Sequence, residues 1–336
     1  MKSKAITLDH GSGGLASHAL IEELFLPLLA NPFLERLDDS AVLPLKGHSL
    51  AFTTDSYVVD PIFFPGGDIG SLSVFGTVND LAMQGASPRY LTLALVMEEG
   101  LSLEELEKII ASIARAAERA GVAVVSGDTK VVPKGKADKI FINTSGIGLI
   151  AEGIEVGSHN ARPGDIVVIN GPVGDHGMAI LAQREGLNLS LSLESDCAPL
   201  NHMVAAILER YPSIHVLRDP TRGGVATALN EIASASNVGI VLEEEGLPIN
   251  SSVKWASEIL GLDPLYIANE GKCLVFAPPE LAQGVVEVMK QFPEGKQARP
   301  IGYVTRENPG RTLLKTLVGG TRILSMLTGE QLPRIC

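Results

Sequence analysis

The chain has 336 residues, 45% of them hydrophobic and 4% aromatic, with 27 basic residues against 39 acidic ones and a net charge of −12. This length exceeds what one hydrophobic core usually organises, so the sequence predicts two domains. The acidic balance and the shortage of aromatic side chains disfavour a protein that binds nucleic acid through phosphates or stacked bases.

The N-terminal residues and the cysteines predict the compartment. No apolar run approaches the roughly 18 residues that cross a membrane, and Met1-Lys2-Ser3-Lys4-Ala5 precedes no stretch of signal-peptide type. Cys197, Cys273 and Cys336 are too few and too scattered for a disulfide framework or a zinc site. We therefore expect a cytoplasmic protein with reduced thiols.

Helices and strands alternate in the first half of the chain. Apolar residues recur at helical spacing after Leu103, with Ser102 and Glu105 as a capping box and Gly121 as the stop. The predicted short strand that follows, at 122–125, is expected to be buried. The remaining expected elements are helices at 15–29, 70–82 and 103–120 and strands at 50–56, 89–98 and 140–150.

A turn-rich link near 152–163 separates this half from a second alternation of strands and helices. The pattern predicts a mixed α/β fold in two lobes, 1–152 and 153–328, followed by a flexible tail at 329–336. Expected strands of the second lobe lie near 165–170, 213–217, 238–242, 272–276 and 311–316, and expected helices near 174–185, 199–210, 222–235 and 278–291.

Aspartates follow several of the predicted elements of the first lobe. Any one of them alone would be a solvated cap, but four such positions suggest a shared role: Asp38-Asp39, Asp55, Asp80 and Asp128. Carboxylate oxygens suit Mg²⁺. A nucleoside triphosphate could lie beside so many negative charges only with cations between its phosphates and the carboxylates.

Three further segments are candidates for anion binding. The glycine-rich loop 10–14 and the segment 218–224 each precede a predicted helix, whose N-terminus favours anions. Lys130, Lys134 and Lys136 follow Asp128 closely. The alternatives are a flexible loop, a structural turn and a solvated turn, respectively. The sequence lacks the Walker and protein-kinase motifs.

The last residues, Pro333-Arg334-Ile335-Cys336, place a thiol at the end of an arm. Proline ends any preceding element, and about seven extended residues would reach roughly 23 Å. The alternative is an accidental thiol on a frayed terminus. Cys197 and Cys273 are expected to be small buried hydrophobes.

Several of these motifs occur in an order that resembles a known superfamily. The series is Asp39-Ser40-Ala41-Val42, Thr54-Asp55, Asn79 to Ala86, Ser126 to Thr129 and Asp219 to Gly224. As a set it resembles the aminoimidazole ribonucleotide (AIR) synthetase, or PurM-like, superfamily of ATP-dependent enzymes. Three more features, His10 to Gly14, Asn269-Glu270-Gly271 and the ending Pro333 to Cys336, resemble its HypE family of hydrogenase maturation factors.

This resemblance implies a PurM-like fold, with an N-terminal lobe that binds ATP and Mg²⁺ and pairs through its sheet into a homodimer. It implies catalytic roles for Cys336, Lys134 and Glu270, the last two as candidates for positioning and proton transfer. The implied cofactor-binding residues are Asp39, Asp55, Asp80, Asp128, Thr129, Arg222 and Gly223, and the four aspartates are the implied metal ligands.

The resemblance also implies an activity and partners. Cys336 would receive a carbamoyl group from a HypF-like carbamoyltransferase, and ATP-dependent dehydration would convert this thiocarboxamide to a thiocyanate. The cyanide would then pass to iron on a HypC–HypD-like complex during maturation of a nickel–iron hydrogenase.

Two other kinds of protein compete with this hypothesis. One is another enzyme of the superfamily, such as thiamine monophosphate kinase, which has no use for a terminal thiol. Selenophosphate synthetase would need a cysteine or selenocysteine in the loop 10–14, which has none. The other is a non-catalytic nucleotide-binding scaffold whose tail docks a partner.

Overall fold

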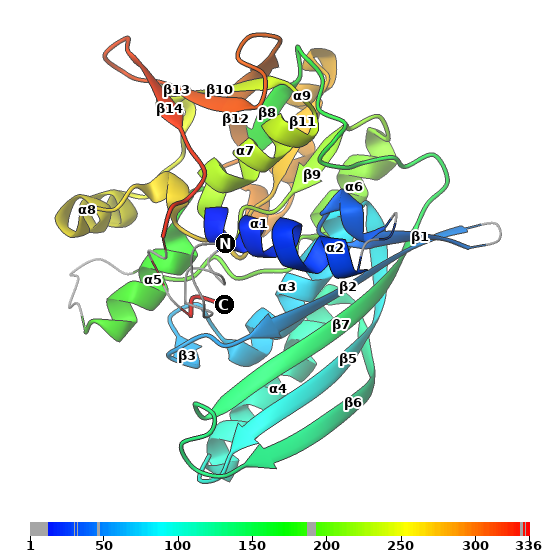
Figure 1. Ribbon diagram of the computed structural model, residues 1–336, viewed down its shortest axis with the longest axis vertical. Helices are drawn as coiled ribbons and strands as arrows, with labels where there is room; N and C mark the ends of the chain where they lie inside the picture. Colours follow the sequence, from blue (N-terminus) through cyan, green and yellow to red (C-terminus); the bar gives the residue numbers. More distant parts are fainter. Residues whose placement is uncertain are drawn as a thin grey trace.

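The computed structural model describes residues 13–29, 31, 33–45, 48–186, 193–329, 332 and 334–336, so most of the loop 10–14 lies outside the described residues. Two sheets with flanking helices form two lobes, and the end of the chain lies between them (Figure 1). In the described part of the chain, no helix combines the length and apolarity needed to cross a bilayer.

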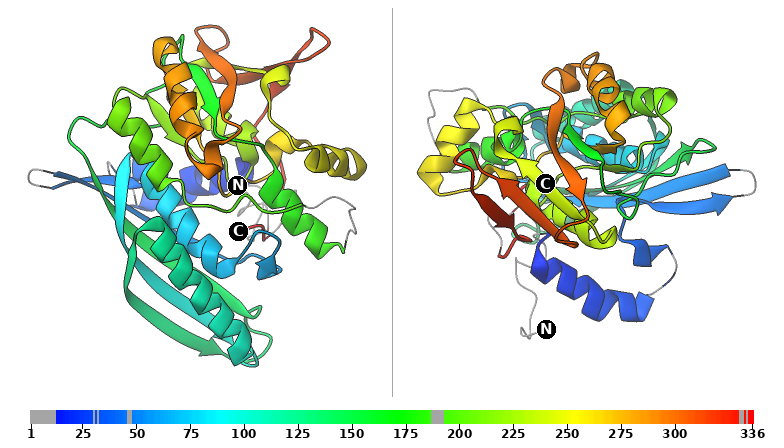
Figure 2. Two further views of the ribbon diagram at one scale, coloured as in Figure 1. Left: turned by 180° about the vertical axis from the view of Figure 1, so that it is seen from behind. Right: turned by 90° about the horizontal axis from the view of Figure 1, so that it is seen from above.

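The first lobe is a five-stranded sheet with helices on one face (Figures 1 and 2). Neighbouring strands are antiparallel, except that β5 and β6 are parallel. The strands, in sheet order, are β1 (Ala41–Leu45), β2 (His48–Tyr57), β7 (Ile140–Ile150), β5 (Ala86–Glu98) and β6 (Ala123–Val132).

Helices α3 (Ile69–Met83) and α4 (Leu103–Ala120) cover this sheet. Asp68 starts α3 with a capping box, because its side chain accepts from the N–H groups of Gly70 and Ser71. Nearly every residue of α3 is buried, as expected for a helix with the sheet on one side and α4 and the second lobe on the others.

Helix α4 confirms the prediction to the residue. The Ser102 hydroxyl accepts from the Glu105 N–H, and Gly121 ends the helix with φ of 71°. The expected capping box is modified, since the Glu105 carboxylate accepts from the Ser102 hydroxyl.

The expectation for residues 122–125 was wrong. Strand β6 is much longer and is exposed along almost its whole length, with Val125 59% and Val131 68% exposed. The reason is its place at the edge of the sheet, where β5 is its only partner strand among the described residues. A run of valines is therefore compatible with an uncovered edge strand.

The second lobe is a seven-stranded sheet with helices on both faces. Val167 and Ile169 share a core with helix α7 (Gly224–Ala235). Val168 between them shares a core with α6 (Asn201–Arg210) and α9 (Pro279–Met289), as the alternation of a strand requires. In sheet order the strands are β14 (Thr321–Leu324), β13 (Arg311–Lys315), β10 (Gly239–Glu243), β12 (Arg299–Thr305), β8 (Ile166–Ile169), β11 (Leu274–Ala277) and β9 (Val216–Arg218).

The remaining helices include the expected ones and one more. The predicted helix at 15–29 consists of α1 (Leu15–Leu20), a π-helical turn (Ile21–Phe25) and α2 (Leu26–Leu29). The second lobe contains α5 (Asp175–Arg184), α6 (Asn201–Arg210), α7 (Gly224–Ala235), α8 (Ser251–Leu260) and α9 (Pro279–Met289). Helix α8 and the strands β1, β12 and β14 were not predicted, nor was the small hairpin of β3 (Phe63–Phe64) and β4 (Gly67–Asp68).

Candidate functional site

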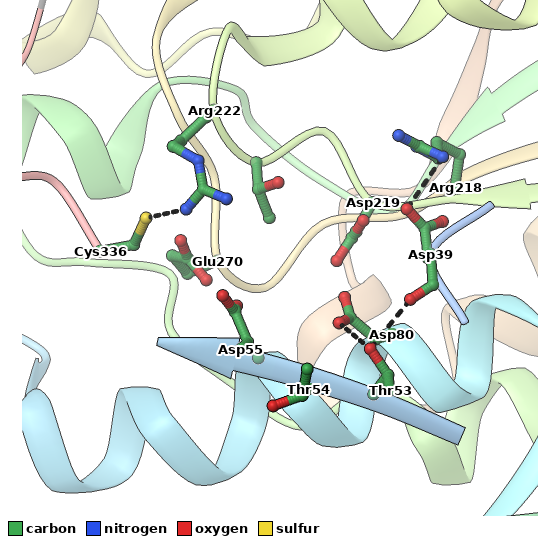
Figure 3. A pocket seen from close by; sticks show the side chains of 12 residues that line it. Asp39, Thr53, Thr54, Asp55, Asp80, Arg218, Asp219, Arg222, Glu270 and Cys336 are labelled. Atoms are coloured by element: carbon green, nitrogen blue, oxygen red, sulfur yellow. Dashed lines mark hydrogen bonds and ion pairs between the residues drawn. The ribbon is translucent and has the colours of Figure 1, made fainter. Parts of the chain in front are cut away.

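A cavity of about 230 Å³ lies where the two lobes meet, and Figure 3 shows its lining. The first lobe contributes Asp39, just before β1, and residues of β2 and α3. The second lobe contributes the segment that leads from β9 into α7, together with Glu270. The end of the chain supplies one more group. The lining residues are Asp39, Thr53, Thr54, Asp55, Gly76, Asp80, Arg218, Asp219, Thr221, Arg222, Glu270 and Cys336.

Negative charge dominates this cavity. Burial, with the nearby charges of Asp219 and Asp55, raises the pKa of the Asp80 carboxyl well above its usual range. Burial also raises the pKa of Asp39 well above its usual range, against the opposing effect of Arg218. Asp219 has a pKa raised to about 6, again mainly by burial. The carboxyl groups that line the cavity therefore outnumber the positively charged side chains that could neutralise them.

Arg218 is fully engaged in a buried network. Its guanidinium contacts Asp39 Oδ1 at 2.9 Å and Glu231 Oε2 at 2.7 Å, and the other oxygen of Glu231 lies 2.9 Å from His18 Nε2. This network ties β9 and α7 to the start of β1 and to α1. Arg218 therefore fixes the position of Asp39.

Arg222 reaches the thiol at the end of the chain. Its Nη1 donates to Cys336 Sγ at 2.6 Å (Figure 3). Cys336 is only 6% exposed, and burial raises the pKa of its thiol to about 12 although Arg222 acts in the opposite direction. In this position the thiol is protonated at neutral pH and is a poor nucleophile.

Glu270 lies on a turn that other residues hold rigidly. The Asp196 carboxylate accepts from the N–H groups of Glu270 and Gly271 and forms a buried ion pair of 2.9 Å with Lys272. Burial, and then the charges of Asp219 and other carboxylates, raise the pKa of Glu270 well above its usual range. Its carboxyl group can therefore exchange protons closer to neutral pH than an exposed glutamate.

Replacing Gly271 with alanine should displace this turn. A Cβ atom there would stand 1.8 Å from the Asp196 backbone oxygen, so the turn must move and carry Glu270 with it. We expect turnover of the site to fall by about 10²-fold, the typical effect of a small misplacement. Gly320→Ala, at an exposed turn, is the matched control. Parent-like turnover in Gly271→Ala would contradict the importance of this turn.

The structure brings together six of the residues singled out in the sequence: Asp39, Asp55, Asp80, Arg222, Glu270 and Cys336. Asp128 and Thr129 lie instead on the exposed edge strand β6, where Lys130 Nζ contacts the Asp128 carboxylate at 2.6 Å. Lys134 is exposed on the connection from β6 to β7, and Gly223 adjoins the cavity without lining it.

The predicted site residues did not include six others that line the cavity: Thr53, Thr54, Gly76, Arg218, Asp219 and Thr221. Three of these belong to the segment 218–224, which was recognised as a candidate for anion binding. Thr53 directly precedes the Thr54-Asp55 motif, and its hydroxyl is 3.0 Å from both the Asp39 backbone oxygen and Asp80 Oδ2. Their closeness in the sequence to the recognised motifs was the signal that could have identified them.

The donor set is compatible with a cation held partly by a substrate. Asp39 Oδ2 is buried without a hydrogen-bond partner, which leaves an unused acceptor at the cavity. Among the described residues, however, no three His, Cys, Asp or Glu side chains come close enough to hold an ion by themselves. Mg²⁺ commonly binds one or two carboxylates and completes its shell with phosphate oxygens and water.

Comparison with known families agrees with this architecture. Residues 37–150 match the N-terminal domain of AIR synthase related proteins, and residues 162–315 match the C-terminal domain. The fold is that of the AIR-synthase-related class.

Full-length relatives define the family within this class. The carbamoyl dehydratase HypE of Rhodobacter capsulatus is 49% identical, with 100% of this chain and 99% of the relative covered. That of Escherichia coli (strain K12) is 45% identical, with coverage of 98% and 99%. The chain belongs to the HypE family of carbamoyl dehydratases, which act in hydrogenase maturation.

Solved structures point the same way. A HypE in complex with ATP is 50% identical with a TM-score of 0.84, covering 99% of this chain and 100% of its own. A HypE–HypF complex contains a chain 48% identical with a TM-score of 0.88, covering 92% and 100%. The thiamine monophosphate kinase of Aquifex aeolicus, 21% identical with a TM-score of 0.64 over 88% of this chain and 97% of its own, shares the fold alone.

Proposed function

We propose that this chain binds ATP and uses it to dehydrate a carbamoyl group carried on Cys336, converting a thiocarboxamide to a thiocyanate. The position of Cys336 Sγ carries this proposal, since the sulfur lies in the acidic cavity beside Arg222, with Glu270 and Asp55 in the same lining. The ATP complex of a relative supports the nucleotide. The cavity is smaller than the roughly 300–1,000 Å³ of a whole-ligand pocket, which suits the carbamoyl group and a terminal phosphate.

The proposed reaction balances without a further reagent. The carbamoyl oxygen attacks the terminal phosphorus of ATP, ADP leaves, and one N–H proton is lost. The C–O bond then breaks as the second N–H proton leaves, so the products are S–C≡N, ADP and phosphate, and the carbamoyl oxygen ends in the phosphate. Phosphorylation turns a poor leaving group into a good one. A base must accept the protons.

The residues of the site have distinct proposed roles. Glu270, with its raised pKa, is the candidate proton acceptor, and Arg222 holds the sulfur. Mg²⁺ would neutralise phosphate charge beside Asp39, Asp55 and Asp80.

Lys134 remains a candidate for positioning. It lies on the β6–β7 connection, whose Asp138 contacts the side chain of Arg334, two residues before Cys336. This contact supports a position of the β6–β7 connection beside the tail.

The exposed edge of the first sheet supports a proposed homodimer. Strand β6 leaves valines, Asp128 and Thr129 uncovered, and Lys134 is exposed on the connection that follows it. We propose that two chains pair through this sheet and that Asp128, Thr129 and Lys134 act in the paired state. Arg222 and Gly223, at the N-terminus of α7, are proposed to face the phosphates.

The proposal also covers the partner proteins and the cellular compartment. The HypE–HypF complex of a relative supports a HypF-like carbamoyltransferase as donor, and a HypC–HypD-like iron scaffold is the proposed acceptor. Three free cysteines support a reducing, cytoplasmic setting. We retain the division into domains at 1–152 and 153–328 with a tail at 329–336.

The test is intact-protein mass after co-expression with the carbamoyl donor, before and after addition of Mg²⁺ and ATP. We expect a gain of one carbamoyl group on the peptide that contains Cys336, followed by loss of one water with ATP. Cys336→Ala should show neither change, whereas Cys273→Ala, which removes a buried thiol of the second lobe, should show both. An unmodified Cys336, or ATP consumption unaffected by Cys336→Ala, would refute the proposal.

A further inference from the structure

The tail tip (residues 334–336) is held through its backbone. The Asp60 N–H donates to the Arg334 carbonyl at 3.2 Å and the Val58 N–H donates to the Cys336 backbone oxygen at 3.0 Å. Between them, the Ile335 carbonyl lies 2.7 Å from His176 Nε2. Each of the three residues of the tail tip therefore has a backbone oxygen that is bound.

We propose that His176 and Arg184, at the two ends of helix α5, are positioning residues that dock the tail tip by its backbone and thereby place Cys336 Sγ beside Arg222 for dehydration. This inference rests on the proposed function of Cys336. Neither residue lines the cavity, so both would act through the tail.

His176 is prepared as a donor by its surroundings. The side chain is fully buried, and burial lowers its pKa, which favours the neutral ring. Its Nδ1 lies 2.8 Å from Ser195 Oγ, and that oxygen already accepts from the Cys197 N–H. We assign the hydroxyl proton to Nδ1, which leaves the ring proton on Nε2, facing the Ile335 carbonyl.

Arg184 joins the tail tip to the backbone segment around Asp60, against which the tail tip lies. Its Nη2 donates to the Arg334 carbonyl at 2.9 Å and to the Asp60 carbonyl at 2.6 Å, and its Nε donates to the same Asp60 oxygen at 3.0 Å. In the opposite direction, Arg334 Nε donates to the Val58 carbonyl at 2.9 Å. One guanidinium therefore bridges two backbone segments that pair side by side.

Burial completes the docking. Ile335 is 4% exposed and packs in the core of the first lobe together with Ile180 of α5. With a buried side chain between two held carbonyls, the position of the following sulfur is restricted. A restricted position is what an in-cavity reaction requires, because small misplacements of a reacting group cost much rate.

The docked position suits dehydration of the carbamoyl group on Cys336, but not the earlier loading of that group onto the thiol. Cys336 is 6% exposed, so a second protein cannot reach its thiol, and the raised pKa makes this thiol unreactive. Docking should therefore favour dehydration of a loaded Cys336 and oppose its loading. Weakening the docking contacts should therefore slow dehydration without slowing loading, whereas a general loss of structure would slow both.

The experiment compares His176→Leu, which keeps volume but removes the donor, with His176→Gln, whose amide can still donate. Arg184→Met, which keeps the apolar stem, is the second probe. Two exposed residues away from the tail provide matched controls, His202→Leu and Arg210→Met. Each protein is treated with iodoacetamide, and alkylation of Cys336 is followed by peptide mass. Separately, carbamoyl loading and single-turnover conversion with saturating Mg²⁺ and ATP are timed.

For His176→Leu and Arg184→Met we expect Cys336 alkylation to accelerate about tenfold, the shift that loss of one hydrogen bond produces. Conversion should slow by a similar factor while loading is unchanged or faster, and His176→Gln should lie near the parent. Parent-like alkylation and conversion would overturn the proposal, as would a parallel fall in loading and conversion. If the parent never carries a carbamoyl group, the proposed function fails, and the alkylation result alone decides whether these residues dock the tail.

Discussion

Replacing Glu270 with glutamine is expected to slow conversion of the loaded Cys336 by about 10²–10⁴-fold, the usual contribution of a general base. The substitution keeps the shape of the side chain. The turn should survive, because Asp196 holds it through backbone N–H groups rather than through the Glu270 carboxylate. ATP binding and carbamoyl loading should therefore persist. Single-turnover measurement of water loss from the loaded protein checks the result.

The pH dependence provides a second readout of Glu270. Burial and neighbouring carboxylates raise its pKa, and a base acts only when deprotonated. The parent rate should therefore increase with pH through a value above that of an ordinary glutamate, and this limb should be absent in Glu270→Gln. Glu258→Gln, on the exposed part of α8, is the matched control. A parent-like rate and pH profile in Glu270→Gln would remove Glu270 from the mechanism.

Local signals account for the elements that sequence analysis predicted well. Helix α4 has a cap at Ser102, an amphipathic face and a glycine stop, so its bounds follow from its own residues. Strand β12 was missed because it contains Pro300 and Gly302, and its pairing with β8 shifts register between them. The exposure of β6 depends on which strand lies at the edge of the sheet, and that is a property of the assembled lobe.

The same distinction separates the predicted site residues from the missed ones. Motifs identified Asp39, Asp55, Glu270 and Cys336, which lie far apart in the chain yet line one cavity. Nothing local identifies His176, whose partner is a backbone carbonyl 159 residues away. Contacts to backbone atoms leave no motif in the sequence, so such residues become visible only in the folded structure.

Arg218 illustrates how strongly the site depends on contacts between residues that lie apart in the sequence. Arg218→Met should destabilise the protein by roughly 3–5 kcal/mol, the cost of removing one partner from a buried ion pair. The Arg218 side chain is 15% exposed, and its guanidinium is shared between the side chains of Asp39, 9% exposed, and Glu231, 20% exposed. The urea midpoint at about pH 8 measures this loss. Arg322→Met removes the pair with Asp263, where the side chains are 48% and 26% exposed, and should cost about 0–1 kcal/mol.

The loss in Arg218→Met should also depend on pH, with a defined sign. Burial already raises the pKa of Asp39 in the folded state, and removing Arg218 removes the charge that lowers it. A carboxyl group with a raised folded pKa contributes stability below its unfolded pKa and loses that contribution as pH rises through the folded value. The deficit should therefore be small near about pH 5 and large near about pH 8. An equal deficit at both pH values, or one no larger than in Arg322→Met, would show that Arg218 does not compensate Asp39, and that the acidic wall of the cavity is held by other contacts.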